Sequence, residues 1–212
     1  MKKLLSLLPL LAIIGCSPER VHIDDIQENK EAKMLFDQGK PFTGITYDVY
    51  SNGQLSFELE IKDGKRNGLY QAWYENGQLR YEGTYKDAKL DGLFQGWYEN
   101  GQLRLKVTYK DDEPDGLFQE WHENGQLRLK ATMKDGKRNG LYQAWYENGQ
   151  WHLKGTYKDA KLDGLLQEWY ENGQLLLQAT FKDDELNGLY QEWDENGTLI
   201  EQSNWKDGVE ID

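Results

Sequence analysis

Apolar and polar side chains alternate along many short stretches of this chain. Within residues 78–86 every second position is apolar or small, at Leu79, Tyr81, Gly83 and Tyr85. A period of two is typical of a β-strand with one packed face. The pair Asn76-Gly77 precedes this stretch, and Asn-Gly between two such runs is a strong signal for a type I′ turn, whose central residues both need positive φ. The pattern therefore predicts a β-hairpin.

The hairpin pattern returns every 24 residues, from Asn52-Gly53 to Asn196-Gly197. Six tryptophans keep the same step: Trp73, Trp97, Trp121, Trp145, Trp169 and Trp193. Residues 62–78 are identical to residues 134–150, which indicates duplication of a block of three units. Such self-similarity is the signature of a repeat architecture.

Pairing outward from Asn76-Gly77 sorts the side chains of one unit onto two sides. The first side is expected to pair Tyr74 with Leu79, Ala72 with Tyr81, Tyr70 with Gly83 and Gly68 with Tyr85. The second side is expected to pair Trp73 with Arg80 and, in later units, Trp145 with His152, Trp169 with Leu176 and Trp193 with Ile200. Because large residues face small ones on the first side, it is the better candidate for the packed face.

One hairpin cannot bury its own apolar side, so the units are expected to stack. Stacking predicts an all-β fold, an elongated single-layer antiparallel β-meander of 24-residue hairpin repeats with an N-terminal signal segment. About fourteen strands, at ~4.8 Å each, give a sheet roughly 65 Å long. Seven repeats are expected over residues 41–212, the first and last of them atypical.

The first fifteen residues differ in kind from the repeats. Lys2 and Lys3 precede an apolar run from Leu4 to Ile14, which is too short to span a bilayer but is typical of a signal peptide. The following Gly15-Cys16 completes a sequence that resembles a bacterial lipobox. We expect residues 1–15 to be a lipoprotein signal peptide and Cys16 to be lipidated, with a plain secretory leader as the alternative. Cys16 is the only cysteine, so no disulfide forms within one chain.

This leader predicts an exported protein that is lipid-anchored to a bacterial membrane. By resemblance to protein sorting in double-membraned bacteria, Ser17 after the cysteine favours the outer membrane where the cell has one. Residues 16–40 are then a tether or a short helix that caps the first hairpin, and both alternatives stay open.

The chain is strongly acidic, with a formal net charge of −12. Removal of residues 1–15 takes away two of the 25 basic residues and none of the 37 acidic ones, which leaves −14. Such a surface repels phosphate backbones, so we expect no nucleic-acid partner. It also disfavours adsorption to anionic lipid, so acyl chains on Cys16 would supply the membrane attachment.

Catalytic and metal-binding patterns are missing from the sequence. None of the three histidines, His22, His122 and His152, has a cysteine or a second histidine at metal-ligand spacing. Residues 183–194 loosely match a calcium-binding EF-hand loop, but equivalent stretches carry lysine at its third place and strands flank it. We interpret it as a polar turn, and we expect no enzyme activity, no cofactor and no metal site.

The tryptophans are the candidate partner-binding residues. One layer cannot hide both faces, so some of Trp73, Trp97, Trp121, Trp145, Trp169 and Trp193 are expected to stay accessible, as binding hot spots require. Such a stripe suits proteins and also glycans. Glutamates at the hairpin tips and Lys-Asp pairs at the opposite edge are either solvated turns or further contact surfaces.

The repeated pattern Gly-x-Tyr-x-x-Trp-Tyr-x-Asn-Gly-Gln-Leu, followed by aromatic-Lys-Asp, resembles the bacterial MORN repeat variant family (the MORN_2 type). Members of that family often carry the label YwqK-like antitoxin. The resemblance covers about residues 41–212, although Val49 stands in the first unit where the others have tryptophan. It implies an elongated β-meander and protein-binding or scaffold roles, and it alone supports the antitoxin role.

The leading interpretation is a non-enzymatic, lipid-anchored cell-envelope repeat protein that presents an extended aromatic and acidic surface to a protein partner. A narrower version is immunity against a secreted toxin. A cell-envelope glycan-binding protein and a passive surface spacer are the alternatives.

Overall fold

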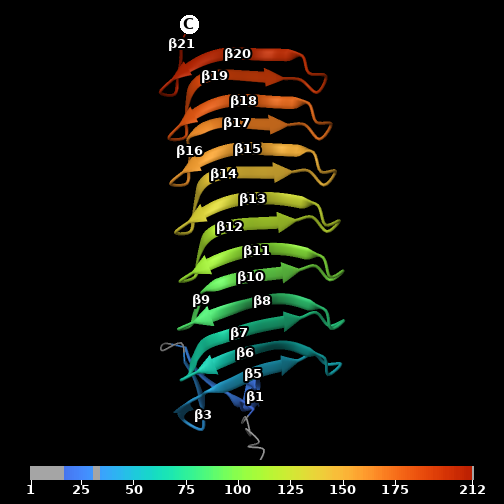
Figure 1. Ribbon diagram of the computed structural model, residues 1–212, viewed down its shortest axis with the longest axis vertical. Helices are drawn as coiled ribbons and strands as arrows, with labels where there is room; N and C mark the ends of the chain where they lie inside the picture. Colours follow the sequence, from blue (N-terminus) through green and yellow to red (C-terminus); the bar gives the residue numbers. More distant parts are fainter. Residues whose placement is uncertain (1–16, 31–33, 212) are drawn as a thin grey trace, which may run out of the picture.

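The computed structural model describes residues 17–30 and 34–211. Its dominant feature is a single long sheet in which the hairpins follow one another in chain order with antiparallel pairing (Figure 1). The expected all-β meander of hairpin repeats is thereby confirmed. The leader and Cys16 lie outside the described residues.

Each repeat contributes two neighbouring strands to the sheet. Its antiparallel strands are β5 (Gly44–Val49), β6 (Leu55–Lys62), β7 (Lys65–Trp73), β8 (Leu79–Lys86), β9 (Lys89–Leu90), β10 (Gly92–Trp97), β11 (Leu103–Lys110), β12 (Glu113–Trp121), β13 (Leu127–Lys134), β14 (Lys137–Trp145), β15 (Trp151–Lys158), β16 (Lys161–Leu162), β17 (Gly164–Trp169), β18 (Leu175–Lys182), β19 (Glu185–Trp193), β20 (Leu199–Lys206) and β21 (Val209–Ile211). Both β9 and β10 pair with β8, and both β16 and β17 pair with β15, so each of these couples forms one interrupted row.

The turn at each hairpin tip differs from the expected type I′ turn. The N–H of Gly77 donates to the carbonyl oxygen of Tyr74 (2.9 Å), and the N–H of Tyr74 donates to that of Gln78 (2.8 Å). Of the pair Asn76-Gly77, only the glycine has a positive φ, at +84°. The loop therefore has three residues and ends in a left-handed glycine. Asn76 stabilises it from its side chain, whose Oδ1 accepts from the N–H of Gln78 (2.9 Å).

A β-bulge compensates for this longer loop. Trp73 pairs with Leu79 but Ala72 pairs with Tyr81, so Arg80 is one extra residue in its strand. The two shifts of one residue cancel beyond the bulge. The expected pairs of the hairpin body are therefore observed, namely Ala72 with Tyr81, Tyr70 with Gly83 and Gly68 with Tyr85.

The expected pairings nearest the tip were wrong, because counting from a two-residue loop omits both the third loop residue and the bulge. Tyr74 faces Gln78 and Trp73 faces Leu79. In later units Trp145 pairs with Trp151, Trp169 with Leu175 and Trp193 with Leu199, in place of His152, Leu176 and Ile200.

The type I′ turns join the strands at their other ends, along the long side of the sheet opposite the hairpin tips. Lys86 pairs with Lys89, and the two residues between them, Asp87 and Ala88, have φ values of +50° and +68°. Equivalent left-handed pairs recur at Asp63-Gly64, Asp111-Asp112, Asp135-Gly136, Asp159-Ala160, Asp183-Asp184 and Asp207-Gly208. The left-handed region costs a residue with a Cβ about 1–2 kcal/mol, so pairing of the flanking strands must enforce it at the alanines and aspartates.

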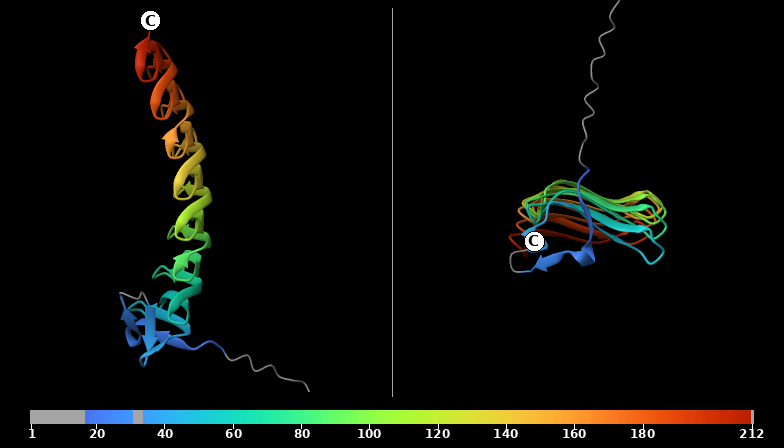
Figure 2. Two further views of the ribbon diagram at one scale, coloured as in Figure 1. Left: turned by 90° about the vertical axis from the view of Figure 1, so that its left-hand side faces the viewer. Right: turned by 90° about the horizontal axis from the view of Figure 1, so that it is seen from below.

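The sheet is one layer thick and curves across its strands, so it has a concave and a convex face (Figure 2). On the concave face, small buried residues lie between rings. Val107, Ala131 and Ala179 are almost inaccessible, while ring pairs such as Phe94 with Tyr109 meet edge to face at 6.0 Å between centroids. A Cβ at Gly83 would lie 2.5 Å from the Phe94 ring, which explains why no larger residue stands there.

A small N-terminal unit, here called the cap, covers the concave face at the first hairpins (Figure 2). It contains β1 (Arg20–His22), the 3-10 turn η1 (Ile23–Asp25), β2 (Gln27–Asn29), β3 (Met34–Asp37) and β4 (Lys40–Pro41). Strand β1 belongs to the long sheet, in which it pairs in parallel with β5, whereas β2, β3 and β4 form a separate antiparallel sheet. The cap packs on a core of Phe42, Leu59 and Ile61.

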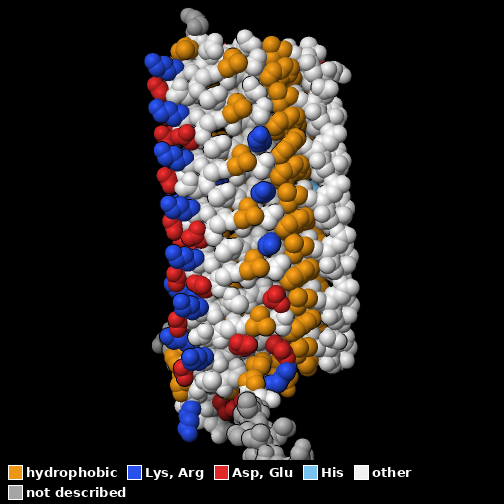
Figure 3. Space-filling model, viewed as in Figure 1, with side chains coloured by type: hydrophobic (Ala, Val, Ile, Leu, Met, Phe, Trp, Pro, Cys, Tyr) orange, Lys and Arg blue, Asp and Glu red, His pale blue; other side chains and the backbone are white. Residues whose placement is uncertain are grey.

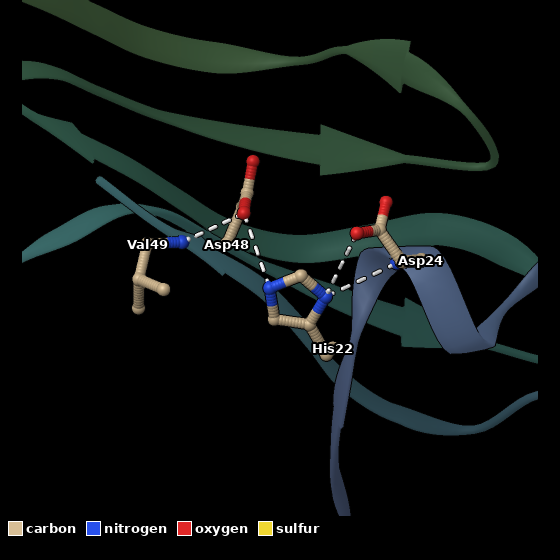
Figure 4. A network of polar contacts seen from close by, with 4 residues as sticks. All are labelled: His22, Asp24, Asp48 and Val49. Atoms are coloured by element: carbon tan, nitrogen blue, oxygen red, sulfur yellow. Dashed lines mark hydrogen bonds and ion pairs between the residues drawn. The ribbon is translucent and has the colours of Figure 1, made fainter. Parts of the chain in front are cut away.

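A histidine joins the cap to the array (Figure 4). The Nε2 atom of His22 lies 3.2 Å from an Oδ1 of Asp48 on β5. The other ring nitrogen, Nδ1, accepts from the N–H of Asp24 (3.3 Å), and the Asp48 carboxylate also accepts from the N–H of Val49 (2.8 Å). Nδ1 also lies 3.7 Å from Oδ2 of Asp24, so the ring stands between the Asp24 and Asp48 carboxylates.

Candidate binding surface

The six tryptophans belong to one continuous surface on the convex face. Each lies at the tip end of its strand and pairs across the hairpin with an apolar residue. The pairs are Trp73 with Leu79, Trp97 with Leu103, Trp121 with Leu127, Trp145 with Trp151, Trp169 with Leu175 and Trp193 with Leu199. Alternation along the strands places these pairs opposite the concave face, where Figure 3 shows an unbroken apolar ridge. We call this set the tryptophan–leucine ridge.

Three indole rings of the ridge contact one another on β14, β15 and β17. The rings of Trp145 and Trp151 stack with centroids 4.7 Å apart, and Trp151 lies 6.0 Å from Trp169. The ammonium of Lys154 lies 6.0 Å from the Trp151 ring centroid, within range of a cation–π contact. Sequence reasoning missed Trp151 because it stands outside the 24-residue tryptophan step. Its occurrence in a slot that holds leucine in other units was the available signal.

A second apolar column runs parallel to the ridge, visible in Figure 3 as separate apolar spots. Its members are 37–44% exposed: Leu69, Leu93, Leu117, Leu141, Leu165 and Leu189. Sequence reasoning did not single them out, although their 24-residue spacing was equally regular. Two apolar columns on one accessible face make it a stronger candidate surface than the tryptophans alone.

A polar column separates the ridge from these leucines, and its charge changes along the array. Glu58 and Glu82 stand first, then Lys106, Lys130 and Lys154, then Gln178 and Gln202. Partner glutamines lie across the strands, as where Gln71 donates to Glu82 (2.7 Å) and Gln167 donates to Gln178 (2.8 Å). The convex face is therefore basic in its middle, although the whole chain is acidic.

Both edges of the sheet are polar. Lysines and acids alternate along the edge of the type I′ turns (Figure 3), with Lys89 and Asp111 3.3 Å apart. At the other edge the tip glutamates 75, 99, 123, 147, 171 and 195 are exposed. The carbonyl oxygen of Glu99 accepts from the Asn76 amide of the preceding unit (3.4 Å), and the same contact recurs up to Asn172.

Arginines lie over rings on the concave face. The Arg80 guanidinium lies 5.4 Å from the Tyr74 centroid and 5.2 Å from that of Tyr81, and Arg104 donates to the Tyr81 hydroxyl (2.7 Å). Burial raises the pKa of the Tyr109 and Tyr142 hydroxyls. These rings are half-buried among one another, and this face packs more of its apolar surface than the ridge side does.

In the turn that resembles a calcium-binding loop, an aspartate carboxylate accepts a hydrogen bond from the main chain of a neighbouring strand. Asp183 and Asp184 form a left-handed turn, and Oδ1 of Asp184 accepts from the N–H of Leu162 (2.7 Å). Within residues 17–30 and 34–211, no three His, Cys, Asp or Glu side chains gather in a way that could hold a metal ion.

No helix in the described part of the chain has the length and apolar character to cross a membrane.

The fold and its ridge define a class of protein, an elongated β-hairpin repeat protein with an extended surface along its array. The profile of the MORN repeat variant family matches six consecutive segments: residues 66–87, 90–111, 114–135, 138–159, 162–183 and 186–207. These matches cover more than half of the chain, which belongs to the MORN repeat variant family. No curated protein matches it.

Proposed function

We propose that this protein is a lipid-anchored component of a cell envelope that binds a partner protein through the tryptophan–leucine ridge. The observation that supports this function is the ridge itself, an apolar surface that continues through the whole array of an otherwise hydrophilic, acidic chain. Tryptophan is the residue type most enriched at binding hot spots, because its large ring buries much area at low conformational cost.

The length of the ridge defines the kind of partner. Each unit adds two strands, or about 10 Å, to the ridge. A stable protein interface buries about 800 Å² on each partner, which a few neighbouring units can supply. The ridge therefore suits an elongated partner, or several copies of a smaller one. The three lysines beside its middle favour a partner that is acidic there.

The anchor and the narrower role come from the sequence. The lipobox-like residues around Cys16 support lipidation and export. The family resemblance supports an antitoxin role, in which the partner is a secreted toxin. Either role uses the same ridge, so one binding experiment addresses both.

Affinity capture from the native cell surface and culture medium tests the proposal. The bait is the soluble chain from Ser17 to Asp212, compared with a variant in which Trp97, Trp121 and Trp145 are alanine. We expect one stoichiometric protein, identified by mass spectrometry, that the triple variant loses. Toxicity of that protein would support the antitoxin role.

The matched control replaces Lys110, Lys134 and Lys158 by alanine, and it should leave capture unchanged, because these residues are exposed in the same three units but lie at the strand ends away from the ridge. Circular dichroism must show that both triple variants keep the β-fold. Capture that survives the tryptophan changes in a folded variant would rule out the ridge as the binding site.

A glycan ligand is the second candidate, because stacked indoles such as Trp145 and Trp151 also suit sugar rings. Co-sedimentation with purified peptidoglycan or capsular polysaccharide would support it. If neither proteins nor glycans bind, the passive spacer is the remaining role.

A further inference from the structure

The hairpin tips of the array share a dipeptide that is chemically reactive. In an Asn-Gly pair the main-chain nitrogen of the glycine can attack the side-chain amide carbon of the asparagine, because glycine has no side chain to obstruct the approach. The seven tip asparagines are Asn52, Asn76, Asn100, Asn124, Asn148, Asn172 and Asn196. All of them are exposed, so accessibility does not distinguish one from another.

Six of these carboxamides are fixed at both ends. The Oδ1 atom of Asn76 accepts from the N–H of Gln78 (2.9 Å), and its Nδ2 donates to the carbonyl oxygen of Glu99 in the next unit (3.4 Å). Both bonds recur at Asn52, Asn100, Asn124, Asn148 and Asn172. A carboxamide held in this way must break both bonds before it can rotate toward the nitrogen of the following glycine.

The tip at Asn196 is built differently. Asp194 stands where the other units carry tyrosine or histidine, and its Oδ1 accepts from the N–H of Thr198 (2.8 Å) and from that of Asn196 (3.0 Å). The pKa of Asp194 is lowered, chiefly by the bond from Thr198. Within the described residues the Asn196 carboxamide makes neither main-chain contact of the other six, and its contact is with the Asp194 carboxylate. An aspartate has thus replaced the asparagine as the side chain that closes the loop.

We propose that Asn196 is a site of spontaneous deamidation in the folded protein. The nitrogen of Gly197 forms a bond to Cγ of Asn196 and gives up its proton. The bond between Cγ and Nδ2 breaks, and Nδ2 leaves with that proton as ammonia. Water then opens the resulting succinimide ring at either of its carbonyl groups, which leaves aspartate or isoaspartate. Water is the one co-reactant, and no electrons are transferred.

The attacking nitrogen is restrained equally at all tips, so it does not select one of them. The N–H of Gly197 donates to the carbonyl oxygen of Asp194 (2.9 Å), and that of Gly77 makes the same bond to Tyr74 (2.9 Å). Only the anchoring of the carboxamide differs. Loss of one or two hydrogen bonds of ordinary net strength corresponds to a rate advantage of about tenfold.

The reaction would alter one end of the tryptophan–leucine ridge. Trp193 and Leu199 form a pair of the ridge and lie on either side of this tip. Isoaspartate lengthens the loop between them by one main-chain atom, and both products add a negative charge beside Asp194. The site itself does not depend on what the ridge binds.

Peptide mapping by mass spectrometry tests the site on the purified full chain, incubated at mildly alkaline pH. We expect Asn196 to deamidate at least tenfold faster than any other tip asparagine. The same incubation in concentrated urea removes the anchoring, so the seven rates should then become similar.

Two double variants exchange the anchoring between neighbouring tips. Asp194→Tyr with Thr198→Gln gives the last tip the residues of the others and should slow the reaction at Asn196. Tyr170→Asp with Gln174→Thr makes the opposite change and should accelerate Asn172 by about tenfold.

Tyr170→Phe is the matched control. It removes the hydrogen bond from the Tyr170 hydroxyl to the Trp193 carbonyl oxygen but keeps the contacts of the Asn172 carboxamide, so Asn172 should stay slow. The proposal is overturned if the folded chain deamidates at all seven tips at similar rates, or if another tip reacts fastest. It is also overturned if the advantage of Asn196 persists unchanged in urea, or if neither double variant changes the rate at its tip.

Discussion

The phenolic hydroxyl of Tyr74 donates a hydrogen bond of 2.8 Å to the main-chain carbonyl oxygen of Trp97, one unit further along the array. The same bond recurs from Tyr50, Tyr98, Tyr146 and Tyr170 to the tryptophan of the next unit. His122 occupies the tyrosine position once, and its Nε2 lies 3.0 Å from the Trp145 oxygen. This ladder connects neighbouring units at their tips, beside the strand pairing that joins them elsewhere.

Removal of one of these hydrogen bonds between units should lower the stability of the array measurably. Tyr98→Phe keeps the ring but leaves the Trp121 carbonyl oxygen without its donor, so we expect a loss of about 0.5–1.5 kcal/mol in the free energy of unfolding. Urea denaturation followed by tryptophan fluorescence measures it. Tyr157→Phe is the control, because the Tyr157 hydroxyl has no hydrogen bond within the described residues, and an equal loss there would refute the role of the ladder.

The left-handed turns offer a stabilising change. Ala88→Gly and Ala160→Gly replace a Cβ at φ of +68° and +70° by a residue that adopts this region freely. Each should raise the free energy of unfolding by about 1 kcal/mol. The reverse change, Gly136→Ala, should lower it by a similar amount, because a Cβ there meets nothing closer than 3.8 Å and only the backbone conformation is at issue. Thermal denaturation of the three variants checks these signs, and stabilisation by Gly136→Ala would contradict the account.

Stability should fall at high pH. The pKa of Tyr190 is raised from 10.0 to about 12. Burial of the hydroxyl is the largest cause, and its hydrogen bond to Glu192 is the second. The folded protein holds this proton more tightly than the unfolded chain, so the stabilising contribution is complete below pH 10 and is lost as the pH rises toward 12. Tyr190→Phe should therefore make stability less dependent on pH in that window.

The same titration can be followed directly by absorbance at 295 nm. The difference between the original protein and Tyr190→Phe isolates the Tyr190 phenolate. In a Glu192→Gln background its midpoint should move down from about 12 toward 10. An unchanged midpoint would show that Glu192 does not contribute.

Lipidation of Cys16 can be tested without a known partner. Cells given an alkyne fatty acid should label the original chain, whereas Cys16→Ser, which removes the acceptor sulfur, should stay unlabelled. Gel fluorescence after coupling of a dye measures the label. Absence of label on the original chain, with other lipoproteins of the same cells labelled, would favour the plain secretory leader.

The sequence by itself determined the strand pattern, the 24-residue unit and the stacking of hairpins into one sheet. These features follow from the alternation of apolar and polar residues within each unit and from the regular spacing between units, both of which are local properties of the sequence. Even the pairing of Ala72 with Tyr81 was predictable, since the extra loop residue and the bulge at Arg80 cancel.

The turns were less predictable, because the type I′ turn expected at the Asn-Gly tip is found at the other end of the strands. Asn76-Gly77 has the residues of a type I′ turn but ends a three-residue loop, whereas Asp87-Ala88 forms the type I′ turn despite its alanine. Strand pairing on both sides outweighs the local preference of one or two turn residues. The same shift moved the partner of Trp73 from Arg80 to Leu79 and so created the tryptophan–leucine ridge.

Only the tertiary structure decided the role of the N-terminal residues. Nothing in the local pattern places Val21 beside Thr46, or Ile26 against the core of Phe42, Leu59 and Ile61, because these contacts join segments without a shared period. The threonine at position 46 is visible in the sequence as a departure from the repeat. Its burial depends on the cap that packs beside it, since the accessibility of one side chain is a property of packing between distant segments.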